Sequence, residues 1–141
     1  MDQPEVEFLL LADAVEALQG KLYMLGGAWD KWFAASYPTQ ARMGIALGIS
    51  VPWESTNVKI PIKLRILDAD GQLIGPGEIS SAVEVGRPPG ITPGTRQRAI
   101  LALNTFFPLE RAGRFEVRAQ VGEGAERTVS FDAALGAKPP S

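Results

Sequence analysis

The sequence contains neither cysteine nor histidine. Without cysteine the chain has no disulfide, no thiol nucleophile and no thiolate ligand for a metal ion. Without histidine it lacks the imidazole that most often serves as a general base near neutral pH, and it lacks the other common zinc ligand. Thiol and serine–histidine hydrolases and Cys/His zinc sites are therefore excluded.

Other catalytic signatures are missing as well. The chain has no Ser-x-x-Lys pattern for a serine nucleophile and no Gly-x-x-x-x-Gly-Lys-Ser/Thr loop for a nucleotide phosphate. Carboxylate pairs are present, but spacing along the chain does not bring an acid and a base to the two sides of a sugar bond. We expect no catalytic residue and no cofactor.

Long hydrophobic runs are also absent. No stretch approaches 18 uncharged apolar residues, and no positively charged segment precedes the short apolar run at residues 8–12. A membrane span and a signal peptide are therefore not expected, and the cytoplasm is the expected location.

The net charge of −2 is small, but the charges are unevenly distributed. Residues 1–20 contain five acidic residues and no basic one, whereas residues 87–118 contain six arginines and two glutamates. Acidic and basic strands that neutralise each other would explain this pattern. A basic face for an acidic partner is the alternative, with Arg87, Arg96 and Arg98 as candidate binding residues. The low net charge disfavours nucleic acid as the partner.

The main pattern in the sequence is an alternation of apolar and polar residues. It is clearest at residues 42–51, 59–66, 114–121 and 128–132, each of which reads as a strand with one face in a core and one in water. On residues 42–51 the second face carries small or polar residues, such as Gly44, Ala46 and Gly48.

Three further segments are strand candidates. Residues 6–12 and 99–107 are apolar on both faces, as in central or doubly covered strands, and Lys21–Leu25 is a shorter candidate. Residues 12–18 form the one segment where a helical turn competes.

Turn residues separate these segments. Residues 68–71 and 122–124 have hairpin-turn composition, and residues 87–94 form a proline-rich loop. Pro61, within a strand pattern, indicates that this strand lies at a sheet edge or begins with a bulge. We predict an all-β fold, a two-sheet antiparallel sandwich of about seven to nine strands, with barrel closure as the alternative. Residues 1–137 would form one domain, and residues 138–141 a loose tail.

Short motifs are spread along nearly the whole chain: Leu11-Ala12-Asp13, Gly20-Lys21, Gly26-Gly27, Val51-Pro52-Trp53, Asp68-Ala69-Asp70-Gly71, Val85-Gly86-Arg87-Pro88-Pro89-Gly90, and Pro108-Leu109 followed by Gly113-Arg114-Phe115. In these motifs the chain resembles a known family. The chain is similar to a bacterial family of small domains of unknown function, some of them labelled transcriptional regulators. The resemblance implies an immunoglobulin-like sandwich and no established chemistry. The regulator label has no counterpart in the sequence, which contains no helix-turn-helix pattern.

Asp68 and Asp70 stand two residues apart in one predicted turn. Such spacing occurs in calcium loops, which need several oxygens in one tight turn. It is also the ordinary chemistry of turns, in which aspartate accepts hydrogen bonds from nearby main-chain N–H groups. We expect turn chemistry and no metal, with cation binding as the alternative.

Aromatic residues gather in the predicted connection between residues 26 and 39. Trp29, Trp32 and Tyr37 lie within nine residues, and Trp53 follows the next strand. These side chains would either cap one end of the sandwich or form an exposed recognition patch with Asp30 and Lys31 on its rim.

The sequence therefore predicts a non-catalytic interaction module. It would bind a protein partner, or itself, through loops and an open sheet edge. A small-ligand or carbohydrate-binding module that uses the same aromatic segment is the alternative.

Overall fold

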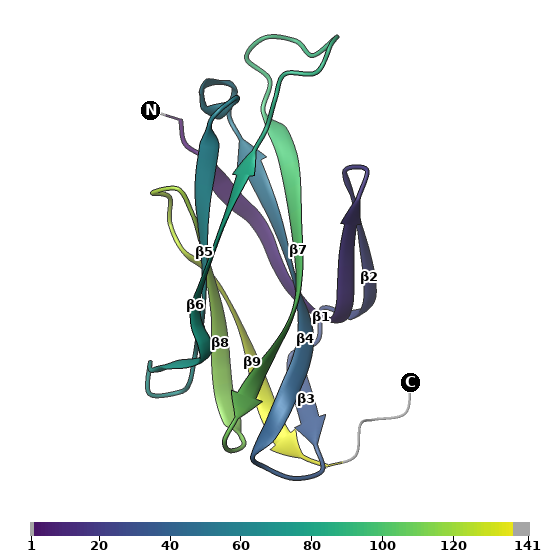
Figure 1. The fold of residues 1–141 in the computed structure, drawn as a ribbon, viewed down its shortest axis with the longest axis vertical. Coiled ribbons are helices and arrows are strands. Elements are labelled where there is room, and N and C mark those ends of the chain that lie inside the picture. Colours follow the sequence, from purple (N-terminus) through teal and green to yellow (C-terminus); the bar gives the residue numbers. More distant parts are fainter. Residues whose placement is uncertain (1, 137–141) are drawn as a thin grey trace.

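Two β-sheets pack face to face in the computed structural model, which describes residues 2–136 (Figure 1). These residues contain nine strands and, as their one helical element, the three-residue 3₁₀ helix Trp53–Ser55. The all-β sandwich is thus confirmed, with the strand number at the upper end of the expected range. The tail at residues 138–141 lies outside the described residues. The four-stranded sheet runs in the order β2 (Lys21–Gly27), β1 (Glu5–Leu18), β4 (Thr39–Val51) and β7 (Gln97–Leu109), and the five-stranded sheet in the order β3 (Lys31–Ala34), β9 (Arg127–Leu135), β8 (Gly113–Val121), β5 (Lys59–Leu67) and β6 (Leu73–Glu84).

The order of the central strands is immunoglobulin-like. β1–β4–β7 faces β9–β8–β5–β6, which corresponds to strands A-B-E facing G-F-C-C′. The sandwich is not antiparallel throughout, because β3 pairs with β9 in parallel, from Lys31 opposite Asp132 to Ala34 opposite Leu135. β3 falls in the segment expected to be a connection. Its four residues are too few to show a period of two.

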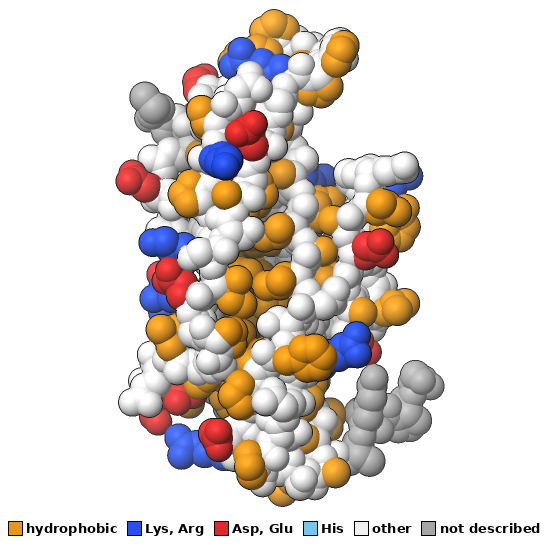
Figure 2. All heavy atoms as spheres, in the orientation of Figure 1, with side chains coloured by type: hydrophobic (Ala, Val, Ile, Leu, Met, Phe, Trp, Pro, Cys, Tyr) orange, Lys and Arg blue, Asp and Glu red, His pale blue; other side chains and the backbone are white. Residues whose placement is uncertain are grey.

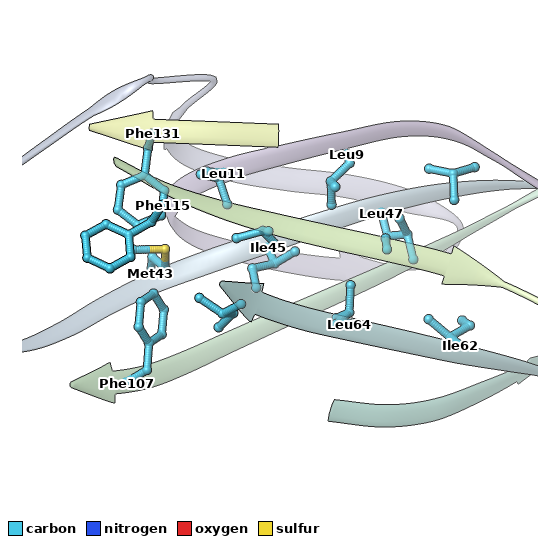
Figure 3. Packing of buried hydrophobic residues seen from close by; sticks show 14 of the residues in the cluster. Leu9, Leu11, Met43, Ile45, Leu47, Ile62, Leu64, Phe107, Phe115 and Phe131 are labelled. Carbon is cyan, nitrogen blue, oxygen red and sulfur yellow. The ribbon is translucent and has the colours of Figure 1, made fainter. Parts of the chain in front are cut away.

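The core lies between the sheets and consists of the apolar members of each alternating segment. β4 contributes Met43, Ile45 and Leu47, which are at most 1% exposed. At one end, Met43 and Phe107 lie close to Phe115 and Phe131 (Figure 3). The rings of Phe115 and Phe131 stack with their centroids 5.5 Å apart.

The outer face of β4 is buried too, which the sequence analysis did not expect. After Ala12, β1 leaves β4 and forms a hairpin with β2. The residues of β1 and β2 cover the small residues of β4 in a second apolar cluster around Val15 and Ala46. A Cβ at Gly48 would lie 2.1 Å from the ring of Phe8, and one at Gly44 would lie 3.0 Å from Val15. Small residues occur on this face because side chains of β1 and β2, such as Phe8 and Val15, lie over it.

Asn104 ties this hairpin to the sandwich. It lies on β7 opposite Gly44, and its side-chain amide contacts the main chain of Val15. The Val15 N–H donates to Asn104 Oδ1 at 3.0 Å, and Asn104 Nδ2 donates to Val15 O at 2.9 Å. These two bonds take the place of the main-chain hydrogen bonds that β1 no longer makes to β4 after Ala12. Residues 12–18 therefore belong to a strand, and the alternative prediction of a helical turn there is wrong.

Pro61 lies neither at a sheet edge nor at a bulge, in contrast to the expectation. β5 has β8 on one side and β6 on the other, and its irregularity lies between Arg65 and Leu67. Pro61 O accepts a hydrogen bond from Gly122 N at 2.8 Å. The N and O of one strand residue point to the same side, so the Pro61 ring nitrogen also faces β8. It lies beyond Val121, the last residue of β8, where the ladder has ended and needs no N–H donor from Pro61.

We predict that Asn104→Ala lowers the free energy of unfolding by about 1–3 kcal/mol, because it leaves the Val15 N–H and C=O without partners next to a buried side chain. Urea denaturation measures this change, and hydrogen exchange at the Val15 amide should accelerate in the variant. The neighbouring Thr105→Ala serves as the control and should change stability by less than about 0.5 kcal/mol. Equal effects of the two substitutions would contradict the role of Asn104.

Candidate functional site

Three of the four candidate aromatic residues lie at one end of the sandwich. Trp29, Trp32 and Tyr37 are half-buried and pack against the core. The Trp29 ring meets Phe131 edge-on, with centroids 5.8 Å apart. The Tyr37 hydroxyl donates to Ala134 O at 2.9 Å, and burial raises the pKa of that hydroxyl. These side chains therefore cap one end of the core, which is the first of the two alternatives from the sequence.

Two of them, Trp29 and Trp32, also line an open groove. The groove has a volume of about 840 Å³. Trp29, Trp32 and Phe33 form its aromatic wall, and Tyr37 is not part of the lining. The Trp29 indole N–H is buried and has no hydrogen-bond partner within residues 2–136. The remaining lining residues are Asp13, Ala14, Gly26, Gly27, Asp30, Lys31 and Arg42.

The groove lies between the base of the β1–β2 hairpin and β3. Main-chain hydrogen bonds fix both sides: Ala28 N donates to Leu11 O at 2.7 Å, and Asp132 N donates to Asp30 O at 2.8 Å. Gly26 has a φ of +55°, and a Cβ there would lie 2.3 Å from the Asp13 carboxylate. Glycine is thus needed where this carboxylate covers the turn into the groove.

The walls carry charges of both signs. Asp30 and Lys31 line the groove as expected for the rim, and Asp13 and Arg42 join them. The Arg42 guanidinium also lies 5.6 Å from the centroid of the Phe106 ring. Sequence reasoning missed Asp13 and Arg42 as site residues, because only the folded arrangement brings β1 and β4 to the aromatic segment. Phe33 lies within the aromatic segment that the sequence identified.

Trp53 does not belong to this groove. It follows β4, whereas Tyr37 precedes it, so that the length of β4 separates the two residues. The Arg87 guanidinium lies 3.8 Å from the centroid of the Trp53 ring. Arg87 Nε donates to Thr56 Oγ1 at 2.7 Å, and Nη2 donates to Trp53 O at 3.0 Å. Trp53 and Arg87 therefore hold each other at the other end of the sandwich.

Arg96 and Arg98 pair with the acidic N-terminal segment. Arg98 donates from Nε and Nη2 to the two carboxylate oxygens of Glu7, at 2.7 and 2.9 Å. Arg96 Nη1 lies 2.6 Å from Asp2, and its Nε donates to Ser50 Oγ at 2.7 Å. The pairs form because β1 and β7 flank β4 in one sheet.

Three other arginines of residues 87–118 also pair with acidic side chains. Arg111, Arg114 and Arg118 pair with Asp70, Asp132 and Glu116 at 3.5, 3.4 and 2.8 Å. Together with Arg96 and Arg98, five of the six arginines have a carboxylate partner, and Arg87 lies on Trp53. The arrangement favours neutralisation over a basic binding face.

Asp68 takes part in turn chemistry. Its Oδ1 accepts hydrogen bonds from the main-chain N–H groups of Asp70 and Gln72, each at 2.9 Å. Gly71 in the same turn has a φ of +79°. Within residues 2–136 no group of three or more His, Cys, Asp or Glu side chains is arranged to hold a metal ion. In the same part of the chain, no helix is long and apolar enough to cross a membrane.

The pairing with Arg98 predicts how stability depends on pH. The hydrogen bond from Arg98 lowers the pKa of the Glu7 carboxyl below its usual value of 4.5, and the bond to Glu7 raises the pKa of Arg98. A lowered folded-state pKa contributes stability above the unfolded value, and that contribution is lost as the pH falls through the folded value. Glu7→Gln should therefore be less stable than the wild type at pH 7, and the difference should shrink at pH 3.

Urea denaturation at the two pH values measures this difference. Glu123→Gln, in the exposed β8–β9 turn, is the control and should leave stability unchanged at both. A difference between Glu7→Gln and the wild type that is the same at pH 3 and pH 7 would contradict the pairing.

Comparisons with known proteins place the chain in a family. A search of the curated proteins found no match. A family model described as "Family of unknown function (DUF6941)" matches residues 7–134. The match includes every residue that lines the groove and omits only the two ends of the chain. The chain therefore belongs to the DUF6941 family.

Proposed function

We propose that the protein is a non-catalytic interaction module that binds an extended segment of a partner protein in the groove beside β3. The observation that carries the proposal is the make-up of the groove wall. Asp30, Lys31, Trp32 and Phe33 follow one another along the chain, and all four line the groove. Successive residues of a strand point to opposite faces. A groove lined by all of them follows the edge of β3 rather than one of its faces.

The edge of β3 suits an extended peptide. β3 pairs with β9 on one side and with no other strand in the described part of the chain. An added peptide strand gains main-chain hydrogen bonds from such an edge, and neighbouring pockets select its side chains. Trp29 and Trp32 offer large apolar contact, the usual source of binding hot spots. Asp13, Asp30, Lys31 and Arg42 offer charges of both signs at the rim, which fit a peptide better than a polyanion.

The chemistry of the side chains supports a binding role without catalysis. The chain has no histidine or cysteine, and the groove is lined by two carboxylates and two cationic side chains. We extend the proposal to the setting that the sequence suggests, the cytoplasm of a bacterium. A role in DNA binding receives no support from residues 2–136, which contain no α-helix to form a helix-turn-helix.

A small ligand or a carbohydrate is the second candidate for the same groove. Its volume of about 840 Å³ falls within the range of small-molecule sites, roughly 300–1,000 Å³. Tryptophan faces stack on sugar rings, and a buried indole N–H suits a ligand oxygen. A carbohydrate array read by tryptophan emission separates this candidate from the peptide.

We predict that Trp32→Ala and Lys31→Glu each weaken the binding of extended peptides. Peptides selected on the wild-type protein from a displayed random library serve as probes, and calorimetry measures their affinity. Trp32→Ala should raise Kd about ten-fold or more, because an aromatic anchor is lost. Lys31→Glu should shift the preference towards basic peptides.

Trp53→Ala is the matched control. Trp53 is also half-buried but lies at the far end of β4, so this variant should bind the peptides as the wild type does. Circular dichroism verifies that each variant keeps its strand content. Selected peptides that bind the Trp32 and Trp53 variants equally well would overturn the proposal.

A further inference from the structure

The ladder between β3 and β9 determines which main-chain groups of β3 stay open. Asp132 N donates to Asp30 O at 2.8 Å, and Gly136 N donates to Ala34 O at 3.0 Å. In a parallel ladder, alternate residues of one strand bond to the same neighbouring strand. Asp30, Trp32 and Ala34 therefore direct their N–H and C=O groups towards β9.

The residues between them face the other way. Lys31 and Phe33 direct their N–H and C=O groups to the open edge of β3. The four residues of β3 pair with β9 without a register shift, so this edge is regular. On the open side, β3 pairs with no strand within residues 2–136. Two N–H and two C=O groups are thus available to an added strand.

The same ladder assigns the side chains of β3 to two faces. Residues that lie opposite each other in a ladder share a face of the sheet. Trp32 lies opposite Ala133, which is 4% exposed and belongs to the core. Trp32 is therefore on the core side of the sheet. Lys31, opposite Asp132, and Phe33 are on the outer side.

Charges on the outer side lie next to opposite charges. Basic and acidic side chains also adjoin each other at several places on the face of the molecule shown in Figure 2. On β8 and β9, Arg114 lies opposite Asp132, with 3.4 Å between Arg114 Nη1 and Asp132 Oδ1. Lys31 lies on the other side of Asp132 and is exposed. It forms no ion pair within residues 2–136. The row of alternating charges therefore ends in a cation at the open edge.

We propose that the segment bound at β3 adds as an antiparallel strand, with an acidic residue opposite Lys31 and a large apolar residue opposite Trp32. This inference rests on the proposed function, the binding of an extended segment in the groove. The acidic residue continues the row that runs from Arg114 through Asp132 to Lys31. Opposite charges on neighbouring strands stabilise a sheet, and like charges destabilise it.

The residue opposite Trp32 has its side chain on the core side of β3. There it enters the groove, where Trp29 and Trp32 provide apolar contact. Gly26 and Gly27 also line the groove and leave room because they have no side chains. One large apolar side chain fits this space as the anchor of the segment. The residue before it lies opposite Phe33, where an apolar side chain pairs with the ring.

The short length of β3 favours the antiparallel direction. β2 and β4 belong to the other sheet, so the chain leaves this edge directly before and after β3. An antiparallel segment makes all four main-chain bonds with two residues, those opposite Lys31 and Phe33. A parallel segment needs three alternate residues, spread over five positions, for the same four bonds. From its N-terminus, the bound segment therefore reads apolar, large apolar, acidic.

Selection from the displayed random library tests this sequence preference. Peptides selected on the wild type should be enriched in an acidic residue directly after a large apolar residue. Peptides selected on Lys31→Glu should carry a basic residue at that position, because the charge opposite it is reversed. Lys63→Glu is the matched control. Lys63 is also exposed, but it lies on β5, which does not adjoin β3, so its peptides should keep the acidic residue.

N-methylation of one selected peptide tests the direction and the register without any change to the protein. Methylation of the acidic residue, or of the residue two positions before it, removes an N–H that donates to Lys31 O or Phe33 O. Each should raise Kd about ten-fold or more, because a main-chain bond is lost and a carbonyl is left without a partner. The N–H of the large apolar residue between them points away from β3. Its methylation should change Kd by less than about two-fold, as measured by calorimetry.

The outcomes separate this inference from the proposed function. In a parallel segment the N–H of the large apolar residue would bond to β3, so a loss of affinity at that position alone would overturn the proposal. Equal effects at the three positions, or selected peptides without the acidic preference, would overturn it as well. A wild type that selects no peptides, or peptides that bind Trp32→Ala and Trp53→Ala equally, would instead overturn the binding of an extended segment itself.

Discussion

The burial of β4 on both faces is the constraint on which the rest of the structure depends. Its large residues face the second sheet, and its small residues lie beneath the β1–β2 hairpin. Gly44 and Gly48 leave no room for a Cβ because Val15 and Phe8 occupy the space. The alternation of large and small residues along one strand thus fixes both the sandwich and the position of the hairpin. Asn104 completes this arrangement with its two bonds to Val15.

The arginines stabilise this framework and leave little basic surface. β1 and β7 lie on either side of β4, so the acidic N-terminal segment meets Arg96 and Arg98 directly. At the far end of β4, Arg87 covers the ring of Trp53. The side chains that suggested a basic recognition face are largely occupied within the chain.

The groove proposed for binding arises where the chain departs from a plain immunoglobulin-like sandwich. The β1–β2 hairpin and the short strand β3 are additions to the central strands, and they are consecutive in the chain (Figure 1). Between them they form the groove, and each has an edge that pairs with nothing else in the described residues. The central strands, by contrast, are committed to the core.

The sequence by itself determined the fold class and most of the core. Alternation identified the inward-facing residues of β4, β5 and β8, because a period of two assigns side chains to faces without knowledge of the partner strands. Residue composition also identified the Asp68–Gly71 turn, because the hydrogen bonds of this turn are local. The tertiary structure decided the rest. β3 is parallel to β9, which lies about 100 residues further along the chain, and four residues show no periodicity.

The separation of Trp53 from Trp29 and Trp32, and the meeting of Asp13 with Arg42 at the groove, depend on which strands lie side by side. Neighbouring positions in a pattern do not reveal such contacts between distant segments. These contacts between distant segments depend on the strands that cover the two faces of β4.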